Sequence, residues 1–178
     1  MPVTLRDYAM GEETAPGGLD QILIVKTSDL VSMADIDSTT KKIPAAGFVF
    51  QTGKRFYKFD YLKNSEKSKA GVEAADIGTP QSPAFEAIAK CTIKGKTAVD
   101  DEYLKDIRGT GRLVVALVGQ DGNIRIAGSM TAPAIMHKLN DKGGMDIEEF
   151  NGWEVEFYHK SKRGLVHFDG DILDLLND

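Results

Sequence analysis

The chain has 178 residues, of which 42% are hydrophobic and 28% are charged, as in one ordinary globular domain. Its 22 basic and 27 acidic side chains give a formal net charge of -5. This balance argues against duplex nucleic acid and against an anionic membrane surface as the main partner, because both require clustered Lys and Arg. The single cysteine, Cys91, excludes an internal disulfide and a metal centre built from thiolates.

Targeting and membrane segments are not apparent in the sequence. Residues 1–20 lack the apolar stretch of a signal peptide, and the longest apolar run, 113–118, is far too short to span a bilayer. We therefore expect a cytoplasmic protein without a membrane partner.

The N-terminal third combines a polar segment with two expected strands. Residues 1–18 are rich in Gly and Pro, which predicts a flexible N-terminal arm that is suited to contact neighbouring subunits. A β-rich run predicts a strand over 19–25, and Thr27 to Asp29 carry the side chains of a short helical turn. After a loop over 34–47, residues 55–61 alternate as a strand, with Phe59 and Tyr61 on one face and Phe56 on the other.

The middle of the chain has the clearest patterns. A strand is predicted at 70–77, and strict alternation predicts another over 85–94, with Ala87, Ala89 and Cys91 on the buried face. The principal helix is predicted over 97–108. Thr97 is its expected cap, Gly109 its expected end, and its apolar face comprises Val99, Tyr103, Leu104 and Ile107.

A β-hairpin follows the helix. Residues 113–118 are apolar on both faces, which places this strand in the middle of the structure. Asp121 and Gly122 form the tight turn, since Asp-Gly supplies the positive φ that such turns need, and 124–129 return.

The remaining segments are shorter. We expect a strand at 133–139, a mobile polar segment at 140–149 that contains Gly143 and Gly144, and strands at 153–158 and 165–168. Trp153 is expected in the core. The acidic tail from Asp169 is expected to form a short terminal helix. With about eight short strands and one principal helix, the sequence predicts a mainly β fold, a β-sandwich or open barrel, in which 19–178 form a single domain.

No catalytic or metal-binding constellation is recognisable in the sequence. The three histidines, His137, His159 and His167, do not have metal-ligand spacing, and we interpret them as unrelated surface or rim residues. Cys91 lies in an apolar alternation, which favours a buried, inert thiol. We expect no cofactor, no metal and no enzymatic activity.

A resemblance suggests a function. The segments at 52–59, 82–85, 113–129, 131–134 and 151–157 follow one another in an order that resembles tail-tube-like virion structural proteins of Bacteroidetes prophages. The likeness rests on turn and strand patterns such as Asn151-Gly152-Trp153.

The resemblance implies a β-sandwich subunit of a virion tail. Such a subunit assembles with copies of itself into rings, for which six copies is the expected number, or into tubes, and with other tail proteins, without tight nucleic-acid binding. The expected location is the host cytoplasm and then the virion tail. The expected assembly contacts are Leu5 and Tyr8 in the arm, Asp121 and Gly122 at the hairpin tip, and Gly143 and Gly144.

A second interpretation stays open at this point. The aromatic side chains of 56–61, or Trp153, would also suit the platform of a β-sandwich that binds a small ligand or a carbohydrate. Self-assembly favours the first interpretation, and a strict monomer with an aromatic cleft favours the second.

Overall fold

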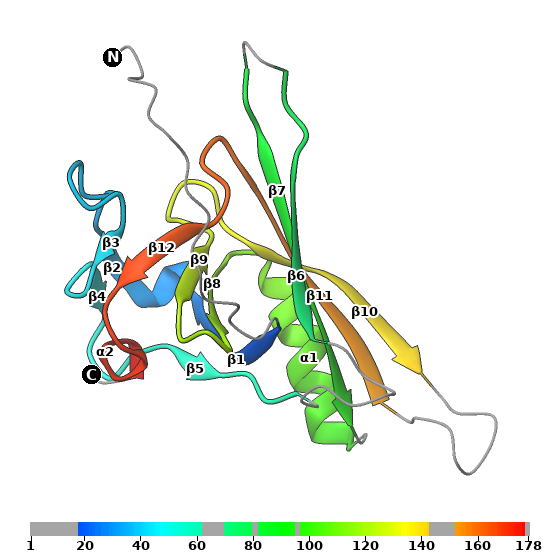
Figure 1. Ribbon diagram of the computed structural model, residues 1–178. Helices are drawn as coiled ribbons and strands as arrows, with labels where there is room; N and C mark the ends of the chain where they lie inside the picture. The colour runs from blue at the N-terminus through cyan, green and yellow to red at the C-terminus, as the bar shows by residue number, and fades with distance from the viewer. Residues whose placement is uncertain (1–17, 62–69, 80–81, 95–96, 143–151, 177–178) are drawn as a thin grey trace.

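The computed structural model shows a mainly β fold built from two sheets that face one another, with one principal helix at their side (Figure 1). It describes residues 18–61, 70–79, 82–94, 97–142 and 152–176. The described segments contain strands β1 to β12, more than the sequence predicts, because several pairings are only two to four residues long.

The central sheet has six strands in the order β3-β12-β9-β8-β1-β5. Its strands are β1 (Leu19–Lys26), β3 (Ile43–Pro44), β5 (Tyr57–Lys58), β8 (Leu113–Gly119), β9 (Ile124–Ala127) and β12 (Val166–Asp169). Every residue of β8 is buried, which confirms the prediction that this strand lies in the middle. The β8–β9 hairpin is confirmed as well.

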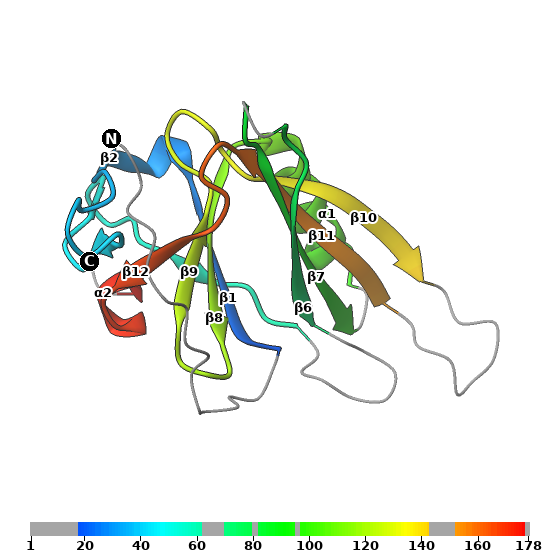
Figure 2. The same ribbon diagram turned by 45° about the horizontal axis from the view of Figure 1, so that its top comes forward.

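The second sheet has four antiparallel strands in the order β10-β11-β7-β6. They are β6 (Gly71–Asp76), β7 (Phe85–Lys94), β10 (Ile135–Lys142) and β11 (Gly152–Ser161). The alternating residues of β7 and β11 point into the space between the sheets, as predicted, and Trp153 is among them. Figure 2 shows the two sheets as separate layers, which makes the fold a β-sandwich and not a closed barrel.

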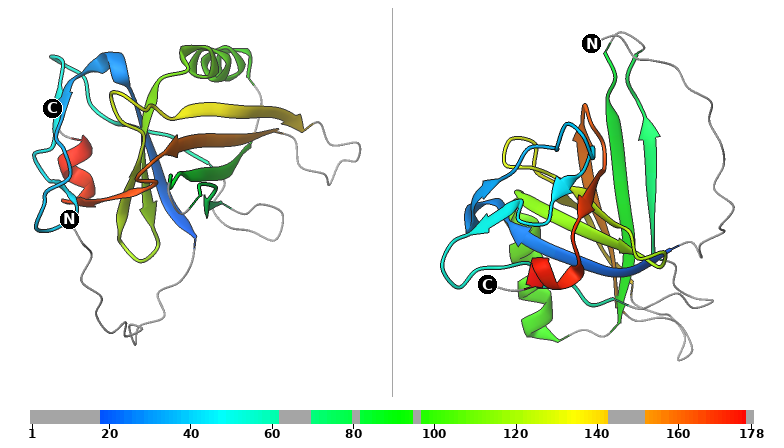
Figure 3. Two further views of the ribbon diagram at one scale, coloured as in Figure 1. Left: turned by 90° about the horizontal axis from the view of Figure 1, so that it is seen from above. Right: turned by 60° about the vertical axis from the view of Figure 1, so that its left-hand side comes forward.

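The other face of the central sheet has its own cover. This consists of the short pair β2 (Leu30–Met33) and β4 (Phe48–Phe50), together with α2 (Ile172–Leu176) near the C-terminus (Figure 3). Leu175 of α2 is fully buried there, which confirms a short terminal helix packed on the body. A short 3-10 turn, η1 (Thr27–Asp29), stands where the sequence predicts a helical turn.

Two hydrophobic cores therefore lie on the two faces of one sheet. The first core, between the sheets, takes Ile22, Val115 and Leu117 from the central sheet and Val155 and Phe157 from β11. The second core is made by the alternate residues of the same central strands. Its members from β1 and β8 are Leu23, Val25, Val114, Ala116 and Val118. A strand that is apolar on both faces is what such a three-layer arrangement requires.

The principal helix α1 (Ala98–Thr110) begins where predicted but ends and packs differently. The Thr97 hydroxyl accepts from the amide of Asp100 at 3.2 Å, which confirms the cap. Gly111, with φ 63°, ends the helix, and Gly109 lies inside it. Leu104 and Ile107 are buried, whereas Val99 and Tyr103 are 77% and 52% exposed, because only one side of the helix meets the sheets. The expected four-residue apolar face is therefore wrong for these two.

Three further predictions need correction. Residues 55–61 form only the two-residue strand β5, and Tyr57 is 39% exposed, whereas Phe56 and Phe59 are buried in different cores, on opposite faces as the alternation predicts. Residues 140–142 belong to β10 and not to a mobile loop. The segment at 34–47, expected as loop, contains the short strand β3.

Candidate functional site

The predicted assembly residues fall into two groups. Asp121 and Gly122 lie at the tip of the β8–β9 hairpin and are exposed. Leu5, Tyr8, Gly143 and Gly144 lie outside the described residues. The structure therefore shows the geometry of the hairpin tip alone among these elements.

The hairpin tip is held together by its own polar groups. The Asp121 carboxylate accepts from the Asn123 amide at 3.0 Å and from Asn123 Nδ2 at 2.8 Å. These bonds, the side-chain contact with Asn123 first, lower the pKa of Asp121. Gly122 has φ 79°, as the turn requires. The carboxylate thus stabilises the turn.

The same tip touches the start of β1. The backbone amide of Gln120 donates to the carbonyl oxygen of Gly18 at 3.2 Å. Residues 1–17 therefore join the described structure beside the turn that contains Asp121 and Gly122.

The aromatic side chains that suggested a ligand platform belong mostly to the cores. Phe56 is fully buried and contacts Phe48 edge-on, with ring centroids 5.1 Å apart. Phe59 lies in the other core, edge-on to Phe157 at 5.2 Å. Trp153 is 8% exposed. Phe56, Phe59 and Trp153 are therefore enclosed in the cores, and among residues 56–61 the exposed ring is that of Tyr57, at 39%.

A groove is present elsewhere, at the end of the central sheet opposite to the hairpin tip. Its first part is a cavity of about 420 Å³ between the chain at 33–36, the turn at 128–132 and the loop at 159–166. The second part, of about 510 Å³, continues along 36–41 and 162–167. Both parts share Ile36, Lys162, Arg163 and Val166, and we call the whole the loop groove.

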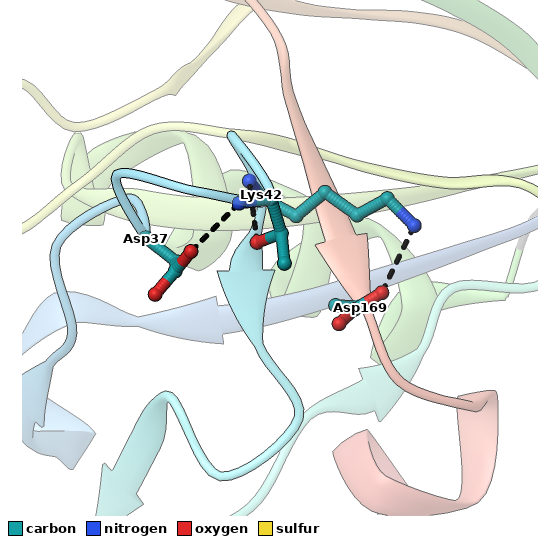
Figure 4. Close-up of polar contacts among 4 residues, drawn as sticks. Asp37, Lys42 and Asp169 are labelled. Carbon is teal, nitrogen blue, oxygen red and sulfur yellow. Dashed lines mark hydrogen bonds and ion pairs between the residues drawn. The ribbon is translucent and has the colours of Figure 1, made fainter.

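One wall of the loop groove is the segment 36–41, which its own hydrogen bonds keep in shape. Asp37 Oδ1 accepts from the amides of Thr39 at 2.8 Å and Thr40 at 2.7 Å. The backbone bonds to Asp37, those of Thr40 first, lower its pKa. Lys42 Nζ reaches across to Asp169 Oδ1 of β12 at 2.9 Å, so the segment is tied to the central sheet (Figure 4).

His159 and Ser161 form the polar centre of the opposite wall. His159 is only 4% exposed, so its interpretation as a surface residue is wrong. The alternation of Trp153, Val155 and Phe157 continues to positions 159 and 161, and this signal was available in the sequence. Burial lowers the pKa of His159, and the backbone carbonyls of Pro133 and Gly164 act in the opposite direction. The imidazole is accordingly neutral near pH 7.

Ser161 makes hydrogen bonds within the loop that follows β11. Its Oγ accepts from the amides of Gly164 at 2.9 Å and Arg163 at 3.3 Å, and it lies 3.0 Å from His159 Nε2. Because two amides occupy the lone pairs of this oxygen, its proton is directed to Nε2 or to the carbonyl oxygen of Gly164, which lies 3.5 Å away. A nucleophile needs a free lone pair and a base that is oriented by a third group, and no described residue gives His159 Nδ1 a well-aligned bond. The pair therefore stabilises the β11–β12 loop.

The remaining chemistry-bearing residues are not brought together. Cys91 is buried, and burial raises the pKa of its thiol to about 12, which confirms an inert cysteine. Among the described residues, no three His, Cys, Asp or Glu side chains are placed to hold a metal ion. None of the helices in the described segments is both long and apolar enough to cross a membrane.

Comparisons with known proteins are sparse. No profile of a known protein family matches the chain, and no curated protein sequence does. A chain from the solved structure described as "Virion of native gene transfer agent (GTA) particle" aligns over 79% of this chain and 95% of its own length, with 12% identity and a TM-score of 0.43. Similarity at this level does not establish a common fold.

Proposed function

We propose that this chain is a structural subunit of a phage or prophage tail, similar to a tail-tube protein, and that it assembles with copies of itself into rings or tubes. The sequence resemblance suggested this function. The observation in the fold that carries it is the pair of open edges on the second sheet.

These edges are β6 and β10. In the described part of the chain, β6 pairs only with β7, and β10 pairs only with β11. An edge strand presents unpaired amide and carbonyl groups, which are a template for pairing with another chain. Residues 73–76 of β6 are exposed. Figure 1 shows the β6–β7 hairpin projecting beyond the body of the molecule, where a neighbour has access to it.

Pairing of β6 with β10 of another copy is a contact between two different surfaces. Such a contact produces a ring when the rotation closes and a filament when it does not. The net charge of -5 suits a hydrated channel through which DNA passes without binding, because like charges repel. In this proposal the chain performs no reaction.

The test is the state of assembly of the full chain, by light scattering after size exclusion and by negative-stain electron microscopy over a range of concentrations. We expect oligomers that appear as rings or tubes. Ala74→Lys with Ala75→Lys places charges along the β6 edge and is expected to reduce assembly. Glu102→Lys, on the exposed side of α1, is the matched control and is expected to leave assembly unchanged. A strict monomer at all concentrations would contradict the proposal.

The cavity of the loop groove favours a second candidate function, the binding of a small ligand. Its volume of about 420 Å³ is within the range of small-molecule sites. A module that binds a small ligand would stay monomeric and would retain a low-mass compound in native mass spectrometry. Rings without such a compound would exclude it.

A further inference from the structure

The loop groove is shaped for an extended segment of chain. Its two parts, of about 420 and 510 Å³, adjoin one another, since Ile36, Val166 and the loop at 162–163 line both. A compact metabolite would fill one part and leave the other to water. A peptide in an extended conformation would occupy both.

The floor of the groove is apolar. Met33, Ile36, Met130 and Val166 are partly buried side chains that pack against the second core while lining the groove. They offer an aliphatic side chain of a partner a place to be buried.

The rim of the groove carries an excess of positive charge. Lys41, Lys162 and Arg163 line it, against Asp35 and Asp37. The Asp37 carboxylate is already bonded to two backbone amides. No described residue forms an ion pair with Lys162 or Arg163. The cations therefore favour an acidic partner.

The sequence of residues 1–17 has both required properties. It contains apolar side chains, among them Val3, Leu5 and Tyr8, and its charged side chains are Arg6 against Asp7, Glu12 and Glu13. A segment of 17 residues spans up to about 55 Å when extended.

The direction of the chain sets the end of the molecule at which this segment begins. Gly18 lies at the hairpin tip, because its carbonyl accepts from Gln120, and β1 runs from there toward the groove. The tip and the turn at 128–132 are at opposite ends of β8 and β9, which Figure 2 shows as the lower and upper ends of these strands. The seven residues of β8 separate them by about 23 Å. Residues before Gly18 thus start at the end away from their own groove.

We infer that residues 1–17 of one copy bind in the loop groove of a second copy, whose groove end faces the hairpin tip of the first. The inference rests on the proposed self-assembly and names one of its contacts. It gives Leu5 and Tyr8 the role of apolar anchors on Met130 and its neighbours, and it pairs the acidic residues with Lys162 and Arg163. The contact is directional, so it repeats from copy to copy along an assembly.

Mixed cross-linking of full-length chains tests the inference. A Leu5→Cys chain, labelled with heavy isotopes, is mixed with a Thr131→Cys chain, since Thr131 is an exposed residue of the groove. A short bis-maleimide is added, and the buried Cys91 stays unreactive. Because binding raises the local concentration of the two thiols, we expect about tenfold more covalent dimer than with a Glu102→Cys partner, which carries its thiol on α1. Circular dichroism confirms that each variant is folded.

Charge reversal provides the second measurement. Lys162→Glu with Arg163→Glu in the Thr131→Cys chain is expected to lower the yield about tenfold, because like charges then face the acidic segment. Lys105→Glu with Arg108→Glu, which reverses two exposed cations of α1, is the matched control and should leave the yield unchanged.

Several outcomes overturn the inference. Equal yields with Thr131→Cys and Glu102→Cys would do so, and so would insensitivity to charge reversal. A cross-link that forms only within one chain carrying both Leu5→Cys and Thr131→Cys would show that the segment folds back on its own copy. Assembly seen by light scattering without the cross-link would reject this contact and retain the proposed function, whereas a strict monomer would reject both.

Discussion

The indole Nε1 of Trp153 donates a hydrogen bond to Oδ1 of Asp101 at 2.9 Å. Trp153 comes from β11 of the second sheet and Asp101 from the first turn of α1, 52 residues earlier. The bond satisfies the only polar atom of a large core side chain and attaches the N-terminal part of the helix to the sheet. The hydrogen bond that allows the indole to be buried therefore also holds the helix against the sheet.

Removal of this bond should destabilise the fold by a measurable amount. We expect Asp101→Ala to lower the free energy of unfolding by about 1–2 kcal/mol, because it leaves the indole N–H without its acceptor. Glu102→Ala, the exposed neighbouring residue, should change the stability by less than about 0.5 kcal/mol. Urea unfolding followed by circular dichroism measures both. Asp101→Ala should cost little when Trp153 is already Phe, and full additivity of the two changes would contradict the assigned bond.

Trp153 itself should matter far more than its hydrogen bond. Trp153→Ala is expected to cost about 3–5 kcal/mol, since the ring is almost entirely enclosed in the first core. The midpoint of thermal unfolding measures the effect. A midpoint close to that of the unchanged chain would show that Trp153 is not a core residue.

Two glycines should respond to alanine in opposite directions. Gly128 has φ 100°, and an added Cβ would lie 2.7 Å from the Leu113 carbonyl oxygen and 2.8 Å from the Ala134 amide nitrogen. Gly128→Ala should therefore destabilise by more than about 1 kcal/mol. At Gly109, inside α1, an added Cβ meets nothing within 4 Å, and Gly109→Ala should stabilise by up to about 1 kcal/mol. Chemical denaturation of the two variants compares them directly, and a loss of stability in Gly109→Ala would show that its helical position is wrong.

His159 should make the fold sensitive to acid. Burial lowers the pKa of His159 below the ordinary value of 6.5, so between these two pKa values the unfolded chain binds more protons than the folded chain. The contribution of a neutral His159 is therefore complete above pH 6.5 and decreases as the pH falls through that value toward the lowered pKa. Thermal unfolding between pH 7.5 and 5, a range chosen around the ordinary pKa, should depend less on pH in His159→Gln. The exposed His167→Gln is the control, and equal pH dependence in both variants would rule out His159 as the cause.

The Tyr61 hydroxyl is a buried polar group whose removal should stabilise the protein. No described residue gives it a hydrogen bond, and burial, with smaller effects of Cys91 and Asp20, raises its pKa to about 12. Tyr61→Phe keeps the ring and removes the desolvated oxygen, so we expect a gain of about 1 kcal/mol in unfolding experiments. The half-exposed Tyr103→Phe should show no such gain. A loss of stability in Tyr61→Phe would mean that the hydroxyl has a partner.

Deletion of residues 1–17 should separate folding from assembly. Both cores are built from residues 19–175, so the thermal midpoint of the shortened monomer should be nearly unchanged. If the deleted segment binds a neighbour, the oligomers should dissociate at concentrations where those of the full chain persist. Analytical ultracentrifugation of the two chains provides the comparison, and identical assembly would remove any role for the segment.

The local patterns of the sequence determined most of the elements. Alternation along β7 and β11, the Asp-Gly turn of the β8–β9 hairpin and the Thr97 cap are consequences of neighbouring residues, and each is found where it was predicted. A run that is apolar on both faces likewise established that β8 lies between two layers. The mainly β class followed from these signals together.

Only the tertiary structure decided what each side chain faces. The exposure of Val99 and Tyr103 depends on which segments pack together from distant parts of the chain. The loop groove has the same origin, since its walls come from three loops that are far apart in the sequence. Periodicity reports the conformation of neighbouring residues and the apolar faces of a strand, but which segments meet depends on contacts between residues that are tens of positions apart.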